Sequence, residues 1–239
     1  MNPGVDIAGT AGGSGAMFDS IAQRYDLLNR LMSFGLDRRW RHLLVESLAI
    51  DGTRSVLDVA TGTADVALAL ARHYPQAMIY GLDPSERMLE VGREKVSAAD
   101  LSSRISLVQG DAQQMPFAQN HFAAACVSFG IRNFPDRMQG LREMSRVTRP
   151  GGVVAVLELT EPEGRGLIGQ LSRFHVHHLA PCMGAWLSRA PQYRYLQRSI
   201  EAFPRPEEFM QMMQEAGLVG VKHQRLSFGV ATIFVGNVA

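Results

Sequence analysis

Residues 55–65, with the sequence SVLDVATGTAD, constrain the fold of this chain more than any other stretch. Their apolar start predicts a short buried strand with Asp58 near its end, and Gly62 lies in the segment that breaks this strand. Asp65 is predicted to cap a helix over residues 66–73. A strand, a tight glycine turn and a helix N-terminus together present backbone N–H groups to a ligand. The stretch therefore predicts a binding site as well as a local fold.

A second acidic residue supports this interpretation. Asp83 follows Gly62 at about 20 residues, the spacing expected for a carboxylate at the tip of the second strand. In that position a carboxylate accepts hydrogen bonds from two ribose hydroxyl groups. We therefore expect a cofactor that contains a nucleoside.

Strands and helices alternate along most of the chain. Further strands are predicted at residues 77–82, 104–109, 122–128 and 153–159, with helices at 85–97 and 136–147. Ser85 and Asp136 are predicted to cap these two helices, and residues 150–152 are predicted to form a turn before the strand at 153–159. After a last helix at residues 205–216, residues 219–226 and 230–235 predict an antiparallel hairpin. The predicted fold is α/β: a Rossmann-like sheet of seven strands, mostly parallel, with a C-terminal antiparallel hairpin and helices on both faces.

The domain organisation is predicted to be simple. Residues 1–15 are rich in Gly, Ala and Ser, which is typical of a flexible lead-in, and residues 16–239 are predicted to form a single domain. Two helices within residues 16–50 precede the first strand. We expect them to form a lid over the cofactor site, with plain core packing as the alternative. Residues 161–203 interrupt the alternation and predict a helical insertion over the carboxyl edge of the sheet, where ligands bind.

Composition argues against several classes of protein. Of 239 residues, 46% are apolar and 20% charged, as in an ordinary globular chain, and the net charge of +1 gives no reason to expect nucleic acid as a partner. No apolar run approaches the roughly 20 residues of a membrane helix, and the first residues lack the pattern of a secretory signal. Cys126 and Cys182 lack the spacing of metal ligands and suit a reducing compartment. The histidines of residues 174–178 have no convincing further ligand nearby, so we predict no metal site.

The cofactor is predicted to be S-adenosylmethionine rather than a nicotinamide dinucleotide. A dinucleotide site uses three glycines to admit a pyrophosphate, whereas here Gly62 stands alone among acidic residues. A cationic ligand with an amino group and a sulfonium tolerates Asp58 and Asp65. Asp111 follows the third strand, where it can accept a hydrogen bond from an adenine amino group while Ala112 N–H reaches a ring nitrogen. Each acid alone is equally well explained as a cap or turn residue; together, at successive strand ends, they predict a site.

Segments between residues 17 and 236 resemble the class I methyltransferases, and specifically the ubiquinone/menaquinone biosynthesis C-methyltransferases. The segments that carry the resemblance include MFDSIA (17–22), RYDLLN (24–29), VLDVA (56–60), MLEVG (88–92), GDA (110–112), SFGIRNF (128–134), YRYL (193–196) and FG (228–229). SFGIRNF and YRYL are the most specific to the quinone enzymes. The resemblance implies a class I methyltransferase fold, with cofactor contacts from Thr63, Asp83, Asp111, Ala112 and Ser128.

The chain departs from this family's pattern in three places. Ala64 stands where the family usually has Gly, Ala123 where it usually has Asp, and residues 158–162 read ELTEP where it often reads EFSxP. A methyl group at residue 64 is harmless if its backbone φ is negative, and obstructive if the backbone must press on the cofactor. The other two departures bear on the substrate more than on the cofactor.

The resemblance implies methylation of a ring carbon of a polyprenylated quinol, either demethylmenaquinol or a 2-methoxy-6-polyprenyl-benzoquinol. Arg132 is the predicted key catalytic group, because a fixed guanidinium stabilises a phenolate and can hold a water that accepts the ring proton. Asn133 is predicted to orient a quinol oxygen, and Tyr25 to close the site. The structural alternatives are that Arg132 pairs with an acid such as Asp26, and that Asn133 caps the turn.

Partners and location follow from this substrate. A polyprenyl tail requires a tunnel that opens toward a membrane, and arginines of the insertion suggest transient contact with anionic lipid; they are Arg173, Arg189, Arg194 and Arg198. We expect a cytoplasmic protein, peripheral at the inner face of the cytoplasmic membrane, and the sequence is compatible with a homodimer. Three other functions compete: methylation of another lipophilic phenol or small natural product, NAD-dependent oxidoreduction, and cofactor binding without catalysis.

Overall fold

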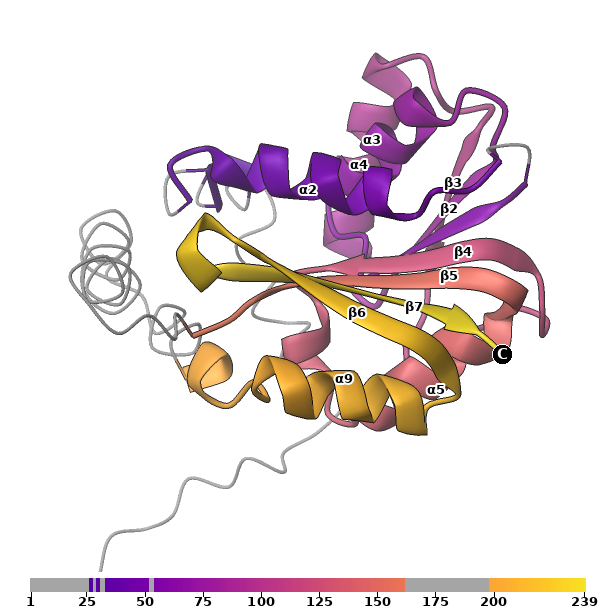
Figure 1. Cartoon of the computed structure of the whole chain (residues 1–239). Helices are drawn as coiled ribbons and strands as arrows, with labels where there is room; N and C mark the ends of the chain where they lie inside the picture. The colour runs from indigo at the N-terminus through magenta and orange to yellow at the C-terminus, as the bar shows by residue number, and fades with distance from the viewer. Residues whose placement is uncertain (1–25, 28, 31–32, 52–53, 162–197) are drawn as a thin grey trace, which may run out of the picture.

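Seven strands form one sheet in the computed structural model, which describes residues 26–27, 29–30, 33–51, 54–161 and 198–239 (Figure 1). The strands are β1 (Val56–Val59), β2 (Ile79–Asp83), β3 (Ile105–Gln109), β4 (Phe122–Ser128), β5 (Thr148–Leu159), β6 (Leu218–Leu226) and β7 (Ala231–Val238). They lie in the order β3-β2-β1-β4-β5-β7-β6. Strands β1 to β5 are parallel, and β7 runs antiparallel to both β5 and β6. The predicted fold class is confirmed, including the C-terminal hairpin.

Helices cover both faces of this sheet. α2 (Leu36–Ser47), α3 (Asp65–His73) and α4 (Glu86–Ala98) lie on one face, and α5 (Arg137–Val147) and α9 (Pro206–Glu215) lie on the other (Figure 1). Short 3-10 turns, η1 (Ile131–Asn133) and η3 (Ser227–Gly229), follow β4 and β6. Two predicted helix caps are confirmed: Ser85 Oγ accepts a hydrogen bond from Met88 N–H (3.2 Å), and Asp136 Oδ1 accepts one from Gln139 N–H (2.9 Å).

The start of α3 differs from the prediction. Ala64, not Asp65, is the N-cap residue, with a left-handed backbone (φ 64°) and no capping bond from its methyl side chain. Asp65 is the first residue of the helix, and its carboxylate forms ion pairs with Arg41 (3.0 Å) and Lys95. A carboxylate at this end of a helix is favourable even without a capping bond, because the helix dipole is positive there. The predicted capping role of Asp65 is therefore wrong, although the helix itself is confirmed.

Strand β5 begins earlier than predicted. The turn expected at residues 150–152 lies inside the strand, as an irregularity in its pairing with β4. Phe122 pairs with Thr148, but Ala124 pairs with Val153, so β5 carries extra residues that bulge out of the ladder. Pairing with β4 thus extends the strand through residues 150–152, although a Pro-Gly-Gly sequence is typical of a turn.

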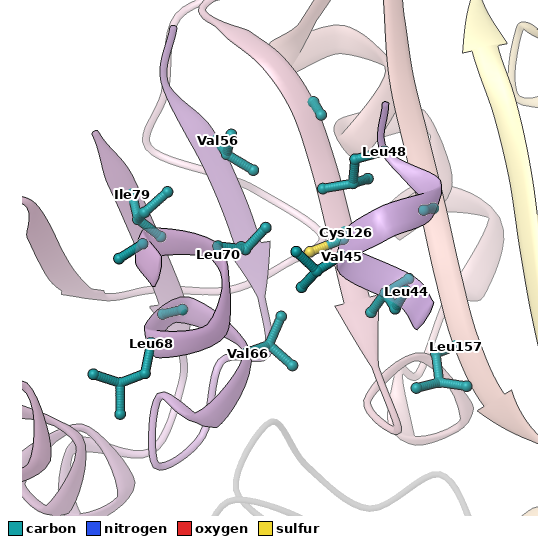
Figure 2. Close-up of a cluster of buried hydrophobic side chains, with 14 of the residues drawn as sticks. Leu44, Val45, Leu48, Val56, Val66, Leu68, Leu70, Ile79, Cys126 and Leu157 are labelled. Atoms are coloured by element: carbon teal, nitrogen blue, oxygen red, sulfur yellow. The ribbon is translucent and has the colours of Figure 1, made fainter. Parts of the chain in front are cut away.

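The apolar core on the α2–α3 side holds these helices against the sheet (Figure 2). Leu44 and Val45 of α2 and Leu70 of α3 pack in one cluster with Val56 of β1 and Cys126 of β4, and none of the five is exposed to solvent. Cys126 is thus a small core residue. Helix α2 packs into this core, as in the alternative prediction of plain core packing for the helices of residues 16–50.

Several predictions concern residues outside the described ranges. The lid role of the first helix and of the insertion therefore stays a prediction. The others concern the lead-in at residues 1–15, Tyr25, the histidines of residues 174–178, Cys182, Arg173, Arg189 and Arg194.

Candidate functional site

The strand order creates a binding edge between β1 and β4. β1, β2 and β3 follow one another outward in one direction, whereas β4 and β5 lie on the other side of β1. In parallel α/β sheets, ligands bind outside the carboxyl ends of the strands at such a switch point. Two loops flank it here, residues 60–64 after β1 and residues 129–133 after β4.

The turn after β1 is built from backbone conformations that favour glycine. Ala60, Gly62 and Ala64 have φ values of 52°, 53° and 64°. A Cβ added at Gly62 would meet no atom of the described residues within 4 Å, so none of them fills the space beside this residue. The two alanines carry strain, about 1–2 kcal/mol each for a left-handed L-residue. The turn therefore offers its backbone, rather than side chains, to a ligand.

Asp83, at the end of β2, holds this turn in place. Its Oδ2 accepts a hydrogen bond from Gly62 N–H (2.8 Å), and its Oδ1 accepts one from Ser85 N–H (2.9 Å). The structure thus brings together the predicted ribose-binding carboxylate and the predicted glycine turn. Gly110 N–H donates to the Asp83 carbonyl (3.1 Å), which joins the turn after β3 to the same edge.

That third turn carries the two residues predicted to meet the adenine. The Asp111 side chain is exposed and accepts a hydrogen bond from the N–H two residues along (2.8 Å), whereas Ala112 is buried. Glu143 of α5 anchors the far side of the turn, where its Oε2 accepts a bond from Met115 N–H (2.7 Å). Hydrogen bonds from Arg146 lower the pKa of Glu143, so this anchor is held in its charged form.

Asp58 lies beneath the turn rather than at its surface. The residue is 1% exposed, Thr61 Oγ1 donates to its Oδ2 (2.5 Å), and Cys126 Sγ lies 4.0 Å from its Oδ1. Burial raises the pKa of Asp58 to about 7, although the bond from Thr61 acts in the opposite direction. This predicted cofactor residue is therefore placed inside the protein, where it supports the turn through Thr61.

Thr63 belongs to a network of charged groups. Its Oγ1 donates to Asp26 Oδ1 (2.6 Å) and accepts from Lys95 Nζ (3.2 Å), and Lys95 also binds Asp65. Burial alone would raise the pKa of Asp65, but the charges of Lys95 and Arg41 outweigh burial and lower it. Thr63 is 2% exposed and its hydroxyl serves this network, so a cofactor contact of Thr63 stays a prediction that its backbone would have to meet.

At the carboxyl end of β4, one polar atom finds no partner in the part of the chain that the structure describes. Ser128 Oγ is buried and has no hydrogen-bond partner among the described residues. The next residue, Phe129, has a left-handed backbone (φ 58°), and its ring packs edge-on against Trp40 of α2, with centroids 6.2 Å apart. Unsatisfied hydroxyls and strained backbone both cost free energy and gather at ligand sites. This geometry suits the cofactor contact predicted for Ser128.

Arg132, the predicted catalytic residue, is bound by Glu158 at the end of β5. Arg132 Nη1 donates to Glu158 Oε1 (2.5 Å) and to the Phe129 carbonyl (2.7 Å), and its backbone N–H donates to Glu158 Oε2 (3.2 Å). The side chains of Arg132 and Glu158 are 8% and 0% exposed. Arg132 Nε is buried and has no hydrogen-bond partner in the described part of the chain. The acceptor for this donor must therefore come from outside the described residues, and a ligand is one such source.

The pairing of Arg132 with an acid was an alternative prediction, and the acid differs from the one named. Asp26 binds Lys95 Nζ (2.8 Å) and Thr63, while Glu158 binds Arg132. Asn133 ends η1, where its backbone N–H donates to the carbonyl at residue 130 (3.0 Å). Arg132 and Asn133 thus lie on one loop at the switch point, as their proposed roles require.

The chain matches one protein family over nearly its whole length. The sequence model of the ubiE/COQ5 methyltransferase family covers residues 11–238. The chain belongs to this family. It is 45% identical over 220 residues to the ubiquinone/menaquinone biosynthesis C-methyltransferase UbiE of Syntrophotalea carbinolica, with 92% of each chain covered. It is 44% identical to the demethylmenaquinone methyltransferase of Deinococcus radiodurans, over 92% of this chain and 90% of that one.

Solved structures of low sequence identity share the fold of this ubiE/COQ5 family member. A SAM-dependent methyltransferase from Aquifex aeolicus is similar with a TM-score of 0.66, at 16% identity and over 92% of this chain and 98% of that one. The [4+2]-cyclase SpnF is similar with a TM-score of 0.71, at 17% identity and over 97% of each chain. The class I methyltransferase fold is thereby confirmed. Because a cyclase shares it, the fold alone does not define the reaction.

Three residues of this family member's site were not among those predicted. Glu158 gave one usable signal: a carboxylate at the end of an apolar strand needs a partner, because buried charges are rarely left alone. The sequence around Lys95 and Arg41 holds no comparable signal, because both lie in helices with many polar residues and only the tertiary fold brings them to Asp65.

Proposed function

We propose that this member of the ubiE/COQ5 family transfers a methyl group from S-adenosylmethionine to a ring carbon of a polyprenylated quinol. The acceptor is demethylmenaquinol, a 2-methoxy-6-polyprenyl-benzoquinol, or both. The observation that carries the proposal is the 44–45% identity, over 92% of the chain, to relatives named for these reactions. The geometry of the carboxyl edge gives it separate support.

The residues at this edge fit S-adenosylmethionine. Asp83 is suited to ribose hydroxyls, Asp111 and Ala112 N–H are suited to the adenine, and none of the described residues fills the space beside Gly62. Ser128 Oγ, which the described residues leave unsatisfied, is a polar contact that a bound ligand would complete. When bound, S-adenosylmethionine supplies an electrophilic methyl group on a sulfonium.

Arg132 is the residue that we assign to the acceptor. A ring carbon is a weak nucleophile, so a quinol hydroxyl must begin to lose its proton as the methyl group moves. Arg132 Nε can donate a hydrogen bond to that oxygen, in a position where the side chain is only 8% exposed and solvent screens the interaction little. Arginine stays protonated and is not itself the base.

The remaining roles follow from this placement. We assign both proton movements to a water beside Arg132: it takes the hydroxyl proton as the methyl group moves, and the ring proton then returns through water to that oxygen, so that one proton is released overall. A second quinol oxygen is assigned to Asn133 on the same loop. Tyr25, outside the described residues, is predicted to close the site. Most of the acceleration is expected from alignment, because transfer in line from the sulfonium requires two reactants to be held in one geometry.

We also propose transient contact with a membrane surface, because a polyprenyl tail does not dissolve in water. In the described ranges, no helix is both long and apolar enough to cross a bilayer. Arg198 is the described member of the arginine set predicted to meet anionic lipid. Flotation with anionic vesicles at low salt checks this idea, and protein that stays apart from the vesicles contradicts it.

Methyl transfer to reduced demethylmenaquinone tests the proposed function. With isotopically labelled S-adenosylmethionine, mass spectrometry should show one labelled methyl group on the quinone ring, and simple phenols should remain unmethylated. Equal turnover of simple phenols would instead support the broader substrate class. Failure to methylate any quinol, with S-adenosylmethionine bound, would contradict the proposal. Thermal stabilisation by S-adenosylmethionine and not by NAD separates it from an oxidoreductase.

A further inference from the structure

Glu158 lies in an unusual position for a carboxylate. It is 0% exposed, near the carboxyl end of β5, and β5 lies between β4 and β7. Its Oε1 accepts hydrogen bonds from Leu159 N–H (2.8 Å) and Arg132 Nη1 (2.5 Å), and its Oε2 accepts one from the Arg132 backbone N–H (3.2 Å). The strand's own backbone therefore fixes the carboxylate, and the carboxylate fixes both the backbone and the head group of Arg132.

These contacts also determine the orientation of the rest of the guanidinium. The group is planar, so fixing Nη1 and the backbone of Arg132 leaves little freedom for its Nε–H. Nη1 has a second acceptor in the Phe129 carbonyl (2.7 Å), whereas Nε is buried without a partner among the described residues. Nε–H is therefore a preorganised donor.

Stability alone does not readily explain this ion pair. Desolvating two charges costs several kcal/mol, and apolar residues in place of a buried pair are often neutral or stabilising. The pair has a second effect, because Glu158 balances the charge of Arg132. In the described part of the chain, charged groups reach this loop from three packed elements: Glu158 from β5, Arg137 from α5 and Arg41 from α2. Arg137 Nη2 donates to the Arg132 carbonyl (3.2 Å), and the Arg41 guanidinium lies 5.7 Å from the centre of the Phe129 ring.

We propose that Glu158 is a positioning residue for methyl transfer. It orients Arg132 so that Nε donates to the acceptor hydroxyl, and it cancels the guanidinium charge so that the pocket receives a neutral quinol. The inference rests on the proposed function, because that function assigns Arg132 to the acceptor. Glu158 itself touches no reacting atom and gives up no proton.

A double-mutant cycle in the full-length chain tests this role. Glu158→Gln keeps the shape of the side chain but removes its charge, and it should lower kcat about 100-fold through misorientation of the donor. The Kd for S-adenosylmethionine and the KM for reduced demethylmenaquinone should change less than about threefold, because Glu158 contacts neither ligand. In an Arg132→Gln background, Glu158→Gln should lower kcat no further, because its effect passes through Arg132.

A matched control separates positioning from damage to the strand. Thr232 pairs with Glu158 across β5 and β7, and it is equally buried. Thr232→Val removes a buried hydroxyl from the same place in the sheet, and kcat should stay within about twofold of wild type if only the Glu158–Arg132 contact matters.

The pH dependence of kcat/KM is a readout that a purely structural role would not move. In Glu158→Gln, the unbalanced guanidinium favours an ionised acceptor, so the acidic limb of the profile should shift to lower pH. Circular dichroism checks that the variant is folded. If Glu158→Gln does not fold, a second pair of variants tests the same point: Arg132→Met alone, and Arg132→Met combined with Glu158→Leu. Their kcat values should be equal, because Glu158 has no effect once Arg132 is gone.

The outcomes divide clearly. Three results would each overturn the role of Glu158: Glu158→Gln retains more than about a third of kcat, it lowers kcat equally in both backgrounds, or the acidic limb of its pH profile does not move. The proposed function would stay intact in each case, provided that the wild-type chain methylates the quinol. A wild-type chain that methylates no quinol would refute the proposed function, and the role of Glu158 with it.

Discussion

Asp58 makes the stability of this chain depend on pH, because its carboxyl group is almost wholly buried. The residue is 1% exposed, and burial raises its pKa from 3.8 to about 7 in spite of the hydrogen bond from Thr61. In the unfolded chain the group is solvated and its pKa returns to the ordinary value. A difference of about three pKa units corresponds to about 4 kcal/mol, at about 1.4 kcal/mol for each unit.

The sign depends on which state binds the proton more tightly. The folded chain has the raised pKa, so this contribution to stability is fully present below pH 3.8 and is lost as the pH rises through 7. Between these values the unfolded chain releases the proton while the folded chain keeps it. The free energy of unfolding therefore falls by about 1.4 kcal/mol per pH unit from this group, and the loss is complete once both states are ionised.

Asp58→Asn removes the ionisation and keeps the shape of the side chain. At about pH 8 the substitution removes the cost of about 4 kcal/mol of ionising a buried Asp58, and so stabilises the folded chain. About 1–2 kcal/mol of this stabilisation is lost again, because the new amide N–H lacks a strong acceptor where Cys126 Sγ lies 4.0 Å away. We expect the variant to be about 2–3 kcal/mol more stable than wild type at about pH 8, and about 1–2 kcal/mol less stable at about pH 4.

Urea unfolding of the cofactor-free chain, followed by circular dichroism between about pH 4 and pH 9, measures this crossover. Glu90→Gln is the matched control, because Glu90 is an exposed carboxylate on α4; it should change the free energy of unfolding by less than about 0.5 kcal/mol. Parallel stability curves for wild type and Asp58→Asn would refute the reasoning, because they would mean that Asp58 titrates alike in the folded and unfolded chains.

Other substitutions test other parts of the site. Ala64→Gly relieves a left-handed backbone and should raise the free energy of unfolding by about 1 kcal/mol in the urea assay; a loss would mean that packing of the methyl group dominates. Arg132→Ala should reduce methyl transfer to a small residual rate while calorimetry finds the affinity for S-adenosylmethionine nearly intact, and retention of most turnover would remove Arg132 from the mechanism. Asp83→Ala removes the acceptor of two backbone N–H groups, so it should weaken S-adenosylmethionine binding about tenfold or more; unchanged affinity would separate Asp83 from the cofactor.

Short-range interactions made much of the fold predictable. Ser85 and Asp136 cap helices through N–H groups only three residues along, so the cap and its partner appear together in the sequence. Strand β4 is an apolar run because helices cover both of its faces, and every residue in it except Ser128 is buried. Asp83 and Gly62 could be paired by spacing, because the helix and the strand that lie between them have a nearly fixed combined length.

Long-range contacts set the features that were missed. The left-handed backbone of Ala64 belongs to a turn that Asp83 holds from another strand, so no local pattern near residue 64 indicates it. The partner of Arg132 depends on the pairing of β4 with β5, which joins side chains 26 residues apart. Glu158 and Asp26 are chemically equivalent as partners in the sequence, and only the fold distinguishes them.

The same long-range packing lets the site keep features that an isolated loop would lose. Phe129 is left-handed, and Ser128 Oγ and Arg132 Nε lack partners among the described residues; each feature costs about 1–3 kcal/mol. A free loop would relax away from them, but this loop joins a buried strand to an ion pair with Glu158 and cannot. A ligand that satisfies the two polar atoms would recover part of that cost on binding, since the atoms are already placed and need no further ordering. The packed core therefore keeps these unfavourable features in place, and a ligand bound at the carboxyl edge would offset the part of their cost that comes from the two polar atoms.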